Sequence, residues 1–279
     1  MNIKEFVKRG KLKKPTDFKQ EVFELEACEI VERILELSEF DEPHSFTRSD
    51  NKLVLEYIFF AVFSNFASSS QKITIANLVS LPNFSRNIAR FATLFGRNSS
   101  DVREILQKFK FPFTVDVYDP LELVIYCYAR YIDYLYYCVF NNDVENLNKE
   151  KTRVSWIHHA AYFLAISENG ELEILIHYFE DIVSKFMERN SDVKSFIYGR
   201  IFGEYDGKSL KGRYDLLTTN SILVDFDASV EVDDVQVFNR LLIGARIINK
   251  TYSSIHVREI IYINPISHTL VRLSSNFVF

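Results

Sequence analysis

Three aspartates in the last third of the chain have the type and spacing to do chemistry. Asp225 and Asp227 lie in the apolar run Ile222–Ala228, which has the character of a β-strand. Because side chains alternate along a strand, the two carboxylates would share one face. Asp215 lies ten residues before Asp225, near the end of the run Gly212–Leu217. A hairpin between the two runs would bring all three carboxylates together.

Three carboxylates packed together repel one another unless a cation lies between them, and a divalent ion with oxygen ligands meets that need. Mg²⁺, for which Mn²⁺ could substitute, would polarise a scissile phosphate and lower the pKa of an attacking water. A nearby Lys or Arg would stabilise the developing charge. The alternative is that the three aspartates lie at a turn and along a solvated strand edge. Spacing alone leaves both interpretations open, since short acidic patterns recur by chance.

The elements that must position these aspartates are readable from residue 171 onward, where a helical apolar pattern gives way to alternation. The predicted order is helix, three strands, helix, two strands, an αβββαββ core of an α/β fold. The predicted ranges are 171–189 (helix), 195–204, 210–217 and 221–228 (strands), 233–249 (helix), and 255–263 and 268–274 (strands).

The part of the chain before the core is predicted to be helical. Periodic apolar residues and capping signals indicate helices at 21–37, 52–66, 85–95, 102–109, 119–140 and 154–166. The polar segment Asn141–Lys151 has the composition of a connector, so we expect an α-helical N-terminal region over 1–150 and the α/β domain over 151–279. Six tyrosines on the 119–140 helix favour burial in a core or a protein interface over base stacking. His158 and His159 point about 100° apart on a helix and are assigned no chemistry.

The chain begins with a basic segment that contains Lys4, Lys8, Arg9, Lys11, Lys13, Lys14 and Lys19. This segment could follow the phosphates of a nucleic acid if it becomes ordered. We favour a solvated, mobile tail, because basic chain ends are common and few aromatic residues are interleaved.

Composition limits the possible functions. The net charge of −5 and the isoelectric point near 5.8 disfavour a protein that coats nucleic acid, so any nucleic-acid contact must be local. Three scattered cysteines support neither a disulfide framework nor a zinc ribbon and indicate an intracellular, reducing compartment. No signal peptide is visible, and the apolar runs are too short or too often interrupted by charge to span a membrane.

Two motifs resemble those of the PD-(D/E)XK nuclease superfamily, in particular its RecB-like exonuclease domains from phages and large DNA viruses. Gly212–Asp215 is similar to the G-R-x-D strand end of that family, and Asp225–Asp227 is similar to its (D/E)-x-K strand. Ile261–Pro265 looks like the family strand that ends in Asn-Pro, and the resemblance spans about Glu171–Leu273. It implies a restriction-endonuclease-like core, Mg²⁺-dependent chemistry on DNA, and a place in the cytoplasm or, for a viral protein, in the host cell or virion.

The resemblance also implies roles for single residues. Asp215 and Asp225 would be metal ligands, while Asp227 stands where the family has its catalytic Lys. Asn239 and Ile243 stand at the positions of the family's Gln and Tyr on the following helix. An acidic residue in place of the Lys would cost several powers of ten in rate unless another group compensates.

Some members of the superfamily take the basic group from a neighbouring helix. The candidates here are Arg240 and then Arg246, with Lys208 and Lys211 as weaker ones. The family's leading helix usually adds another acidic metal ligand, for which Glu180 and then Glu173 are the candidates, although both are also typical surface residues.

Three functional hypotheses remain. The first is a nuclease-like protein of nucleic-acid processing whose cleavage activity is impaired or lost, and which acts as a nucleic-acid-binding or structural subunit. This hypothesis is favoured because three of the five motif positions differ from the family pattern. The second is an active Mg²⁺-dependent deoxyribonuclease with Asp215, Asp225 and Asp227 on the metal and Arg240 as surrogate cation. The third is a helical scaffold whose aromatic N-terminal half binds protein partners.

Overall fold

The chain has a mixed α/β architecture in two compact units. The computed structural model describes residues 1–10, 12, 18–36, 48–66, 82–108, 115–140, 156–188, 196–218, 221–227, 234–252, 254 and 256–274. Met1–Ala27 and Asn190–Phe279 form the sheet unit, and Cys28–Arg189 form the helical unit. This division differs from the predicted domains 1–150 and 151–279, since residues from both ends of the chain build the sheet unit. The predicted connector Asn141–Lys151 lies outside the described residues.

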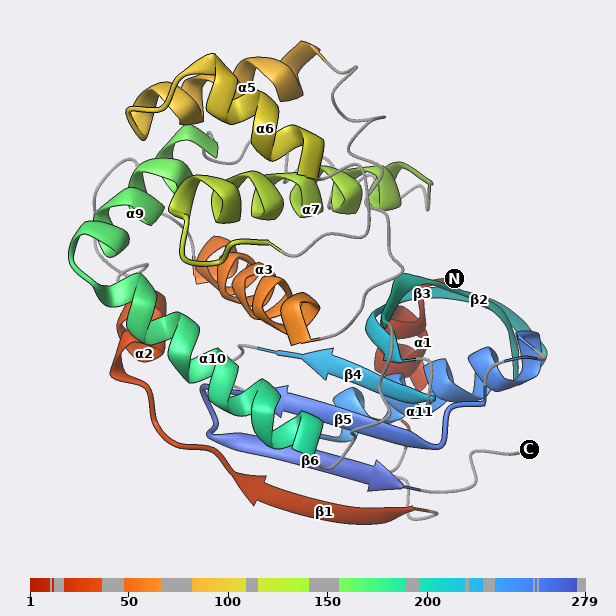
Figure 1. Cartoon of the computed structure of the whole chain (residues 1–279). Helices are drawn as coiled ribbons and strands as arrows, with labels where there is room; N and C mark the ends of the chain where they lie inside the picture. Colours follow the sequence, from red (N-terminus) through yellow and green to blue (C-terminus); the bar gives the residue numbers. More distant parts are fainter. Residues whose placement is uncertain are drawn as a thin grey trace. The chain divides into compact units, whose positions relative to one another are not determined.

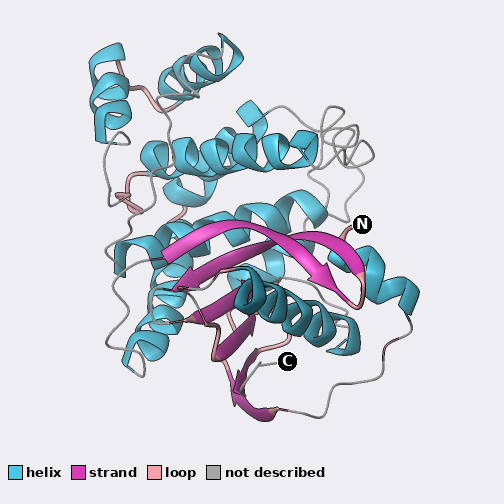
Figure 2. Cartoon of the chain, turned by 90° about the vertical axis from the view of Figure 1, so that its right-hand side faces the viewer, coloured by secondary structure: helices cyan, strands magenta, loops and turns pink. Residues whose placement is uncertain are grey.

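The sheet unit contains a six-stranded mixed sheet in the order β1-β6-β5-β4-β3-β2 (Figure 1). All neighbouring strands are antiparallel except β4 and β5, which are parallel and are connected through helix α11. Figure 2 shows α11 lying across one face of the sheet. The strands are β1 (Lys19–Glu24), β2 (Phe196–Tyr205), β3 (Lys208–Thr218), β4 (Ile222–Phe226), β5 (Glu259–Asn264) and β6 (Thr269–Ser274), and α11 is Asp234–Thr251. The five strands and the helix predicted between residues 195 and 274 are therefore present, in the predicted order.

The helix predicted at 21–37 is wrong in its first part. Lys19–Glu24 form the edge strand β1, which pairs with β6 in register from Lys19↔Ser274 to Glu24↔Thr269, and the helix α2 begins only at Glu29. Val22 and Phe23 have high strand propensity, and pairing with β6 outweighs the weak helical period of this segment. Leu25 continues the pairing, because its N–H donates to His268 O at 2.7 Å.

The predicted mobile tail is also wrong where the structure describes it. Residues Ile3–Gly10 form helix α1, whose Ile3, Phe6 and Val7 are buried in the core beside residues of β3 and α11. The spacing of these three residues places them on one face of a helix. The Lys211 N–H donates to Met1 O at 3.0 Å, which ties the start of α1 to β3. Lys11, Lys13 and Lys14 lie outside the described residues.

The helical unit confirms the predicted helices of the first two thirds of the chain. They are α2 (Glu29–Glu36), α3 (Arg48–Phe66), α5 (Pro82–Leu94), α6 (Ser99–Lys108), α7 (Pro120–Phe140), α9 (Trp156–Glu168) and α10 (Glu171–Glu188). Tyr126 and Tyr128 of α7 are buried, and Tyr128 stacks on Phe84 with ring centroids 5.2 Å apart. These two tyrosines therefore belong to the core, as the aromatic pattern predicted.

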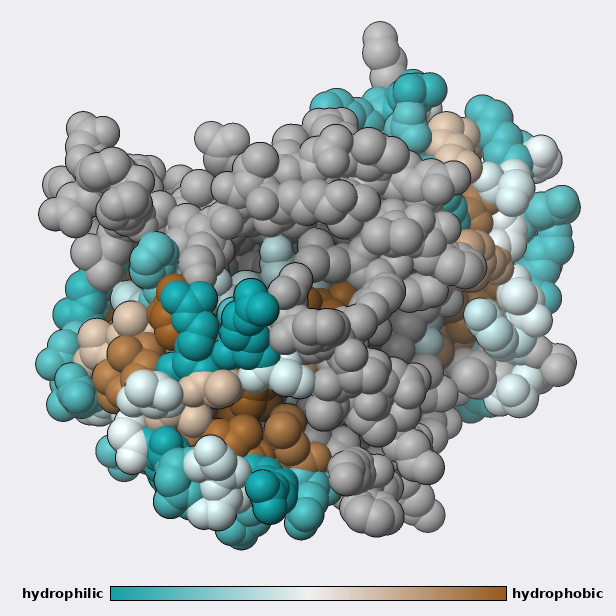
Figure 3. Space-filling model, turned by 90° about the horizontal axis from the view of Figure 1, so that it is seen from above, coloured by the Kyte–Doolittle hydropathy of each residue, from teal (hydrophilic) through white to brown (hydrophobic). Residues whose placement is uncertain are grey.

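The described surface is mixed in polarity. In Figure 3 hydrophilic residues border hydrophobic ones, which is typical of a chain with a mean hydropathy of −0.06. In the part of the chain that the structure describes, no helix has both the length and the apolar character needed to cross a bilayer.

Candidate functional site

Asp215 lies on a β-bulge in β3. Ile197 of β2 pairs with Leu217, but Gly199 pairs with Tyr214, so Asp215 and Leu216 together face a single residue of β2. Such a bulge re-aims a side chain and is common beside functional sites. The Asp215 carboxylate accepts a hydrogen bond from Phe226 N at 3.1 Å. The predicted approach of Asp215 to the Asp225 strand is thereby confirmed.

Asp225 faces α11 and forms an ion pair with it. Asp225 is opposite Tyr262 in the parallel strand β5, and Leu223, on the same face of β4, is opposite Ile260. Leu223, Ile260 and Tyr262 all belong to the hydrophobic core that includes α11. From α11, the guanidinium of Arg240 donates to Asp225 Oδ2. The side chains of Asp225 and Arg240 are only 9% and 23% exposed. Arg240, the first candidate for a surrogate cation, therefore contacts one of the predicted site aspartates directly.

The electrostatics of Asp225 show that the other two aspartates lie close by. Burial raises the pKa of Asp225 to about 7, and Asp215 and Asp227 add to the rise, although Arg240 and Lys4 oppose it. An ion pair by itself lowers the pKa of an acid, so burial and two like charges outweigh it here. Burial also acts to lower the pKa of Arg240, but the three aspartates reverse this and raise it. The cluster formed by Asp215, Asp225, Asp227 and Arg240 is called the aspartate cluster below.

Asp227 follows β4 and stays attached to the sheet. Its backbone N–H donates to Ile263 O at 2.9 Å, which extends the β4–β5 pairing by one residue. Burial raises the pKa of Tyr262, and the charge of Asp227 contributes to the rise. Asp227 is half-buried, whereas Asp225 is buried.

The remaining candidates lie elsewhere in the molecule. Arg246 donates to Tyr205 OH at 3.2 Å, and Lys208 Nζ lies 5.1 Å from the centroid of the Phe6 ring. Glu180 accepts from Tyr118 OH at 2.8 Å in the helical unit, where Glu173 Oε1 lies 3.8 Å from His177 Nε2. The described contacts of Glu180 and Glu173 are therefore with residues of their own unit.

Asn239 and Ile243, which stand at eroded motif positions, have structural roles. Asn239 is buried, and its side-chain amide donates to Val235 O at 2.8 Å, one turn back on α11. Ile243 belongs to the hydrophobic core of the sheet unit.

Lys4 is a member of the site that the sequence did not identify. Its charge acts on Asp225 from α1, where Lys4 is exposed. The many basic residues of this segment favour a mobile tail. The spacing of Ile3, Phe6 and Val7 was the signal that could have revealed a helix packed on the core.

The donor set of the aspartate cluster does not fit a Mg²⁺ or Mn²⁺ ion as it stands. Mg²⁺ requires close to octahedral oxygen coordination at short distances. Here Arg240 binds one Asp225 oxygen and Phe226 N–H binds one Asp215 oxygen. Among the described residues, no three His, Cys, Asp or Glu side chains are grouped so that they could hold a metal ion. The guanidinium of Arg240 instead offsets part of the negative charge.

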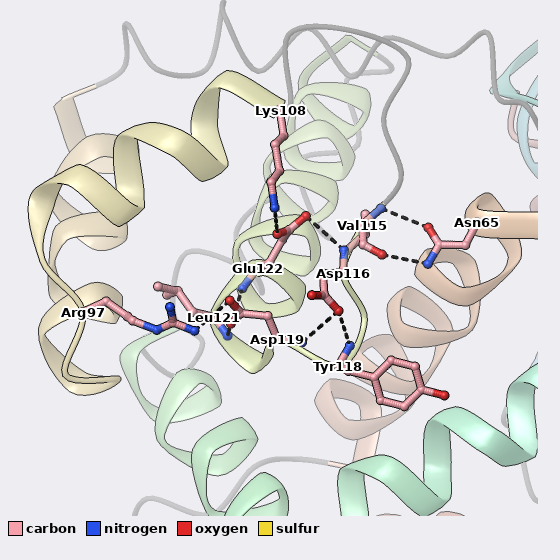
Figure 4. Close-up of polar contacts among 9 residues, drawn as sticks. All are labelled: Asn65, Arg97, Lys108, Val115, Asp116, Tyr118, Asp119, Leu121 and Glu122. Atoms are coloured by element: carbon pink, nitrogen blue, oxygen red, sulfur yellow. Dashed lines mark hydrogen bonds and ion pairs between the residues drawn. The ribbon is translucent and has the colours of Figure 1, made fainter.

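A second polar network lies in the helical unit, at the start of α7 (Figure 4). Glu122 is buried and accepts from Lys108 Nζ at 2.9 Å and from Asp116 N at 3.0 Å. Asn65 exchanges two hydrogen bonds with the backbone of Val115, at 2.7 and 3.0 Å. These contacts hold residues 115–119 against α3, α6 and α7.

The two histidines of α9, to which the sequence assigns no chemistry, differ in burial. His158 is exposed, whereas His159 is buried with its ring centroid 4.7 Å from that of Trp156. Cys28 and Cys127 are buried free thiols.

Comparisons of the chain with protein families, with curated proteins and with solved structures found no significant match.

Proposed function

We propose that the chain is a PD-(D/E)XK-type protein of nucleic-acid processing that binds nucleic acid, or supports a complex that does, with its nuclease activity impaired or lost. The observation that carries the proposal is the buried ion pair between Asp225 and Arg240 inside a group of three aspartates. The order of the strands and helix from residue 196 to residue 274 is the order expected of such a core.

The cluster has the wrong balance of groups for rapid phosphodiester cleavage. Asp227 supplies a negative charge where the resemblance calls for a Lys, and Arg240 is engaged by Asp225. Losing one properly placed donor to a transition state costs about 10²–10³ in rate. A like charge at the same place would repel the phosphate as well, so the expected activity is very low.

A second candidate function, an active Mg²⁺-dependent deoxyribonuclease, is favoured by one observation. Asp215 and Asp227 raise the pKa of Asp225, so the three carboxylates repel one another and an added cation would relieve that repulsion. For that function, substrate or metal would have to draw Arg240 away from Asp225.

The two functions are separated by incubating the purified chain with linear duplex DNA and with single-stranded DNA in Mg²⁺ or Mn²⁺. We expect binding that weakens steeply with salt and no cleavage above that of the Asp225→Ala variant. Cleavage by the wild type that disappears in Asp225→Ala would instead establish the active nuclease. Absence of binding at low salt would remove the nucleic-acid role.

A second experiment tests the role assigned to Arg240. Titration calorimetry with Mn²⁺ compares the wild type, Arg240→Gln, and the Arg240→Gln/Asp225→Asn double variant. We expect Mn²⁺ binding to appear only in Arg240→Gln, because the guanidinium no longer neutralises the carboxylates. Equal Mn²⁺ binding by the wild type would show that Arg240 does not occupy the cation's place.

A further inference from the structure

Strand β1 lies at one edge of the sheet, and part of its backbone points outward (Figure 1). The Leu25 N–H donates to His268 O at 2.7 Å, so Leu25 continues the β1–β6 ladder as a hydrogen-bonded pair. Such pairs alternate along an antiparallel ladder, so the odd-numbered residues of β1 bond to β6 and the even-numbered ones point their N–H and C=O groups away from it. Gln20, Val22 and Glu24 are therefore the outward-facing residues of β1.

The outward-facing residues are exposed. Val22 is 57% exposed, and Gln20 and Glu24 are exposed too. Within the described part of the chain, β6 is the one strand beside them, and none of the three makes a further hydrogen bond or ion pair. At the other edge of the sheet, Thr251 Oγ1 of α11 donates to Phe202 O of β2 at 3.2 Å. The edge formed by β1 is thus the one that can accept another strand.

Val22 ends an apolar row that crosses the sheet. Tyr262 of β5 lies opposite Val271 of β6, and Val271 lies opposite Val22. The exposed fraction rises from 1% for Tyr262 and 5% for Val271 to 57% for Val22. An apolar residue placed opposite Val22 on an added strand would cover it and continue the row, because directly opposed side chains of a sheet contact one another.

A second copy of β1 supplies such a strand. When the copy runs antiparallel with Val22 opposite Val22, Gln20 of each chain lies opposite Glu24 of the other. The three outward-facing residues of one chain then meet the three of the other, which gives three hydrogen-bonded pairs. The side-chain amide of Gln20 can donate to the carboxylate of Glu24, and the two valines bury each other.

The neighbouring registers are less favourable. Shifting the copy by two residues places Val22 opposite Gln20 in one direction and opposite Glu24 in the other. The first shift also brings the two Glu21 side chains face to face, and like charges directly opposite destabilise a sheet. The register centred on Val22 avoids this contact and buries the most exposed apolar side chain of the strand.

We infer that two copies of this chain associate through β1, antiparallel and about a two-fold axis at Val22, so that their two sheets become continuous. The contact is isologous, because the same residues face each other from both sides. The main chain supplies the affinity and the opposed side chains determine the register. One added strand buries less area than a standard interface, so association is weak and depends on concentration. The inference is independent of the proposed function.

The test is sedimentation velocity of the full chain from low micromolar to near-millimolar concentration. The variants are Val22→Lys and Val22→Glu, and Val22→Thr is the matched control that keeps the β-branched shape. Thermal unfolding verifies that each variant is folded. We expect the wild type and Val22→Thr to dimerise, and each charged variant to raise the dimer Kd about 10-fold or more.

An equimolar mixture of Val22→Lys and Val22→Glu should dimerise again, because opposite charges then face each other on the axis. A wild type that stays monomeric at the highest concentration would overturn the inference. Dimerisation that Val22→Lys retains in full would overturn it as well, since the contact would lie elsewhere.

Disulfide crosslinking tests the register. Val22→Cys should form a linked dimer on mild oxidation, because hydrogen-bonded residues of antiparallel strands have Cα atoms about 5.5 Å apart, within disulfide reach. Gln20→Cys alone should stay unlinked, whereas a mixture of Gln20→Cys and Glu24→Cys should crosslink. The wild type under the same oxidation controls for the native cysteines. Crosslinking of Gln20→Cys alone as efficient as that of Val22→Cys would overturn the arrangement about Val22.

Discussion

Glu122 in the helical unit and Asp225 in the sheet unit are both buried carboxylates that pair with a cation, yet their surroundings differ. Each oxygen of Glu122 has its own donor, from Lys108 Nζ and from Asp116 N. Asp225 has Arg240 on one oxygen and two further aspartates within electrostatic reach. The first arrangement fixes a loop. The second holds unresolved repulsion, which is typical of a site that binds or reacts.

The largest expected effect comes from Arg240→Ala, which leaves Asp225 buried among like charges. The free energy of unfolding should fall by about 3–5 kcal/mol at pH 8. The loss should be smaller at pH 5, where Asp225 is protonated because its pKa is about 7. Urea unfolding at both pH values measures this, with Arg240→Ala/Asp225→Asn as the control that should recover much of the loss. An equal loss at both pH values would contradict the interpretation.

The next largest effect should follow from Glu122→Ala in the helical unit. The N–H of Asp116 loses its acceptor, whereas Lys108, whose side chain is 46% exposed, can turn to water. We expect the free energy of unfolding to fall by about 2 kcal/mol, because one buried donor is left unsatisfied and a hydrogen bond to a charged group is lost. Chemical denaturation measures it. Lys185→Met, which breaks an exposed pair with Asp181, is the control and should have almost no effect.

Asp225→Asn should change how stability depends on pH. The folded pKa of about 7 lies above the ordinary value of 3.8, so between these pH values the folded state binds a proton that the unfolded state has lost. Asp225 therefore makes stability fall as pH rises from about 4 to 7. Asp225→Asn should remove that fall. The difference in free energy of unfolding between the variant and the wild type should therefore shift by about 1–2 kcal/mol in favour of the variant from pH 5 to pH 8. The measurement is the melting temperature of the wild type and of Asp225→Asn across this pH range. Parallel curves for the two proteins would show that Asp225 is an ordinary acid.

The smallest effect should come from Asp119→Ala, which removes the cap of α7. Asp119 Oδ1 accepts from Leu121 N at 2.9 Å, and Oδ2 accepts from Arg97 at 2.8 Å. Loss of the cap should cost about 1 kcal/mol, and loss of the partly exposed Arg97 pair should add little. Arg97→Ala isolates the second contribution. A loss as large as that of Glu122→Ala would contradict the role of Asp119 as a simple helix cap.

The sequence predicted the order of the strands and α11, because alternation and turns are local signals. It also predicted that Asp215 approaches Asp225, since a hairpin determines that proximity. It did not reveal the bulge at Asp215, which depends on the pairing of β2 with β3. Nor did it reveal β1, whose partner β6 is formed by residues 269–274 at the far end of the chain. Pairing at such a separation outweighs the helical period of the segment, and it cannot be read from neighbouring residues alone.

Within the site, position alone made Arg240 a candidate, because α11 follows the aspartate strand. The ion pair that it forms depends on how α11 packs, which a sequence pattern does not specify. Lys4 shows the opposite limit. The apolar period of its helix can be read from the sequence. The effect of the Lys4 charge on the pKa of Asp225, however, depends on the packing of Ile3 against Gly212, which the sequence does not reveal.

The division of the sheet unit between the two ends of the chain has a consequence for synthesis. Met1–Ala27 are synthesised before the helical unit, yet β1 finds its partner only when residues 269–274 follow. The uninterrupted segment Cys28–Arg189 can meanwhile form its own core, as domains generally do during translation. The sheet is thus completed last, by closing a long loop, which slows folding. Until then β1, in which Lys19, Gln20, Glu21 and Glu24 are polar, lacks the strand beside which it lies in the finished sheet.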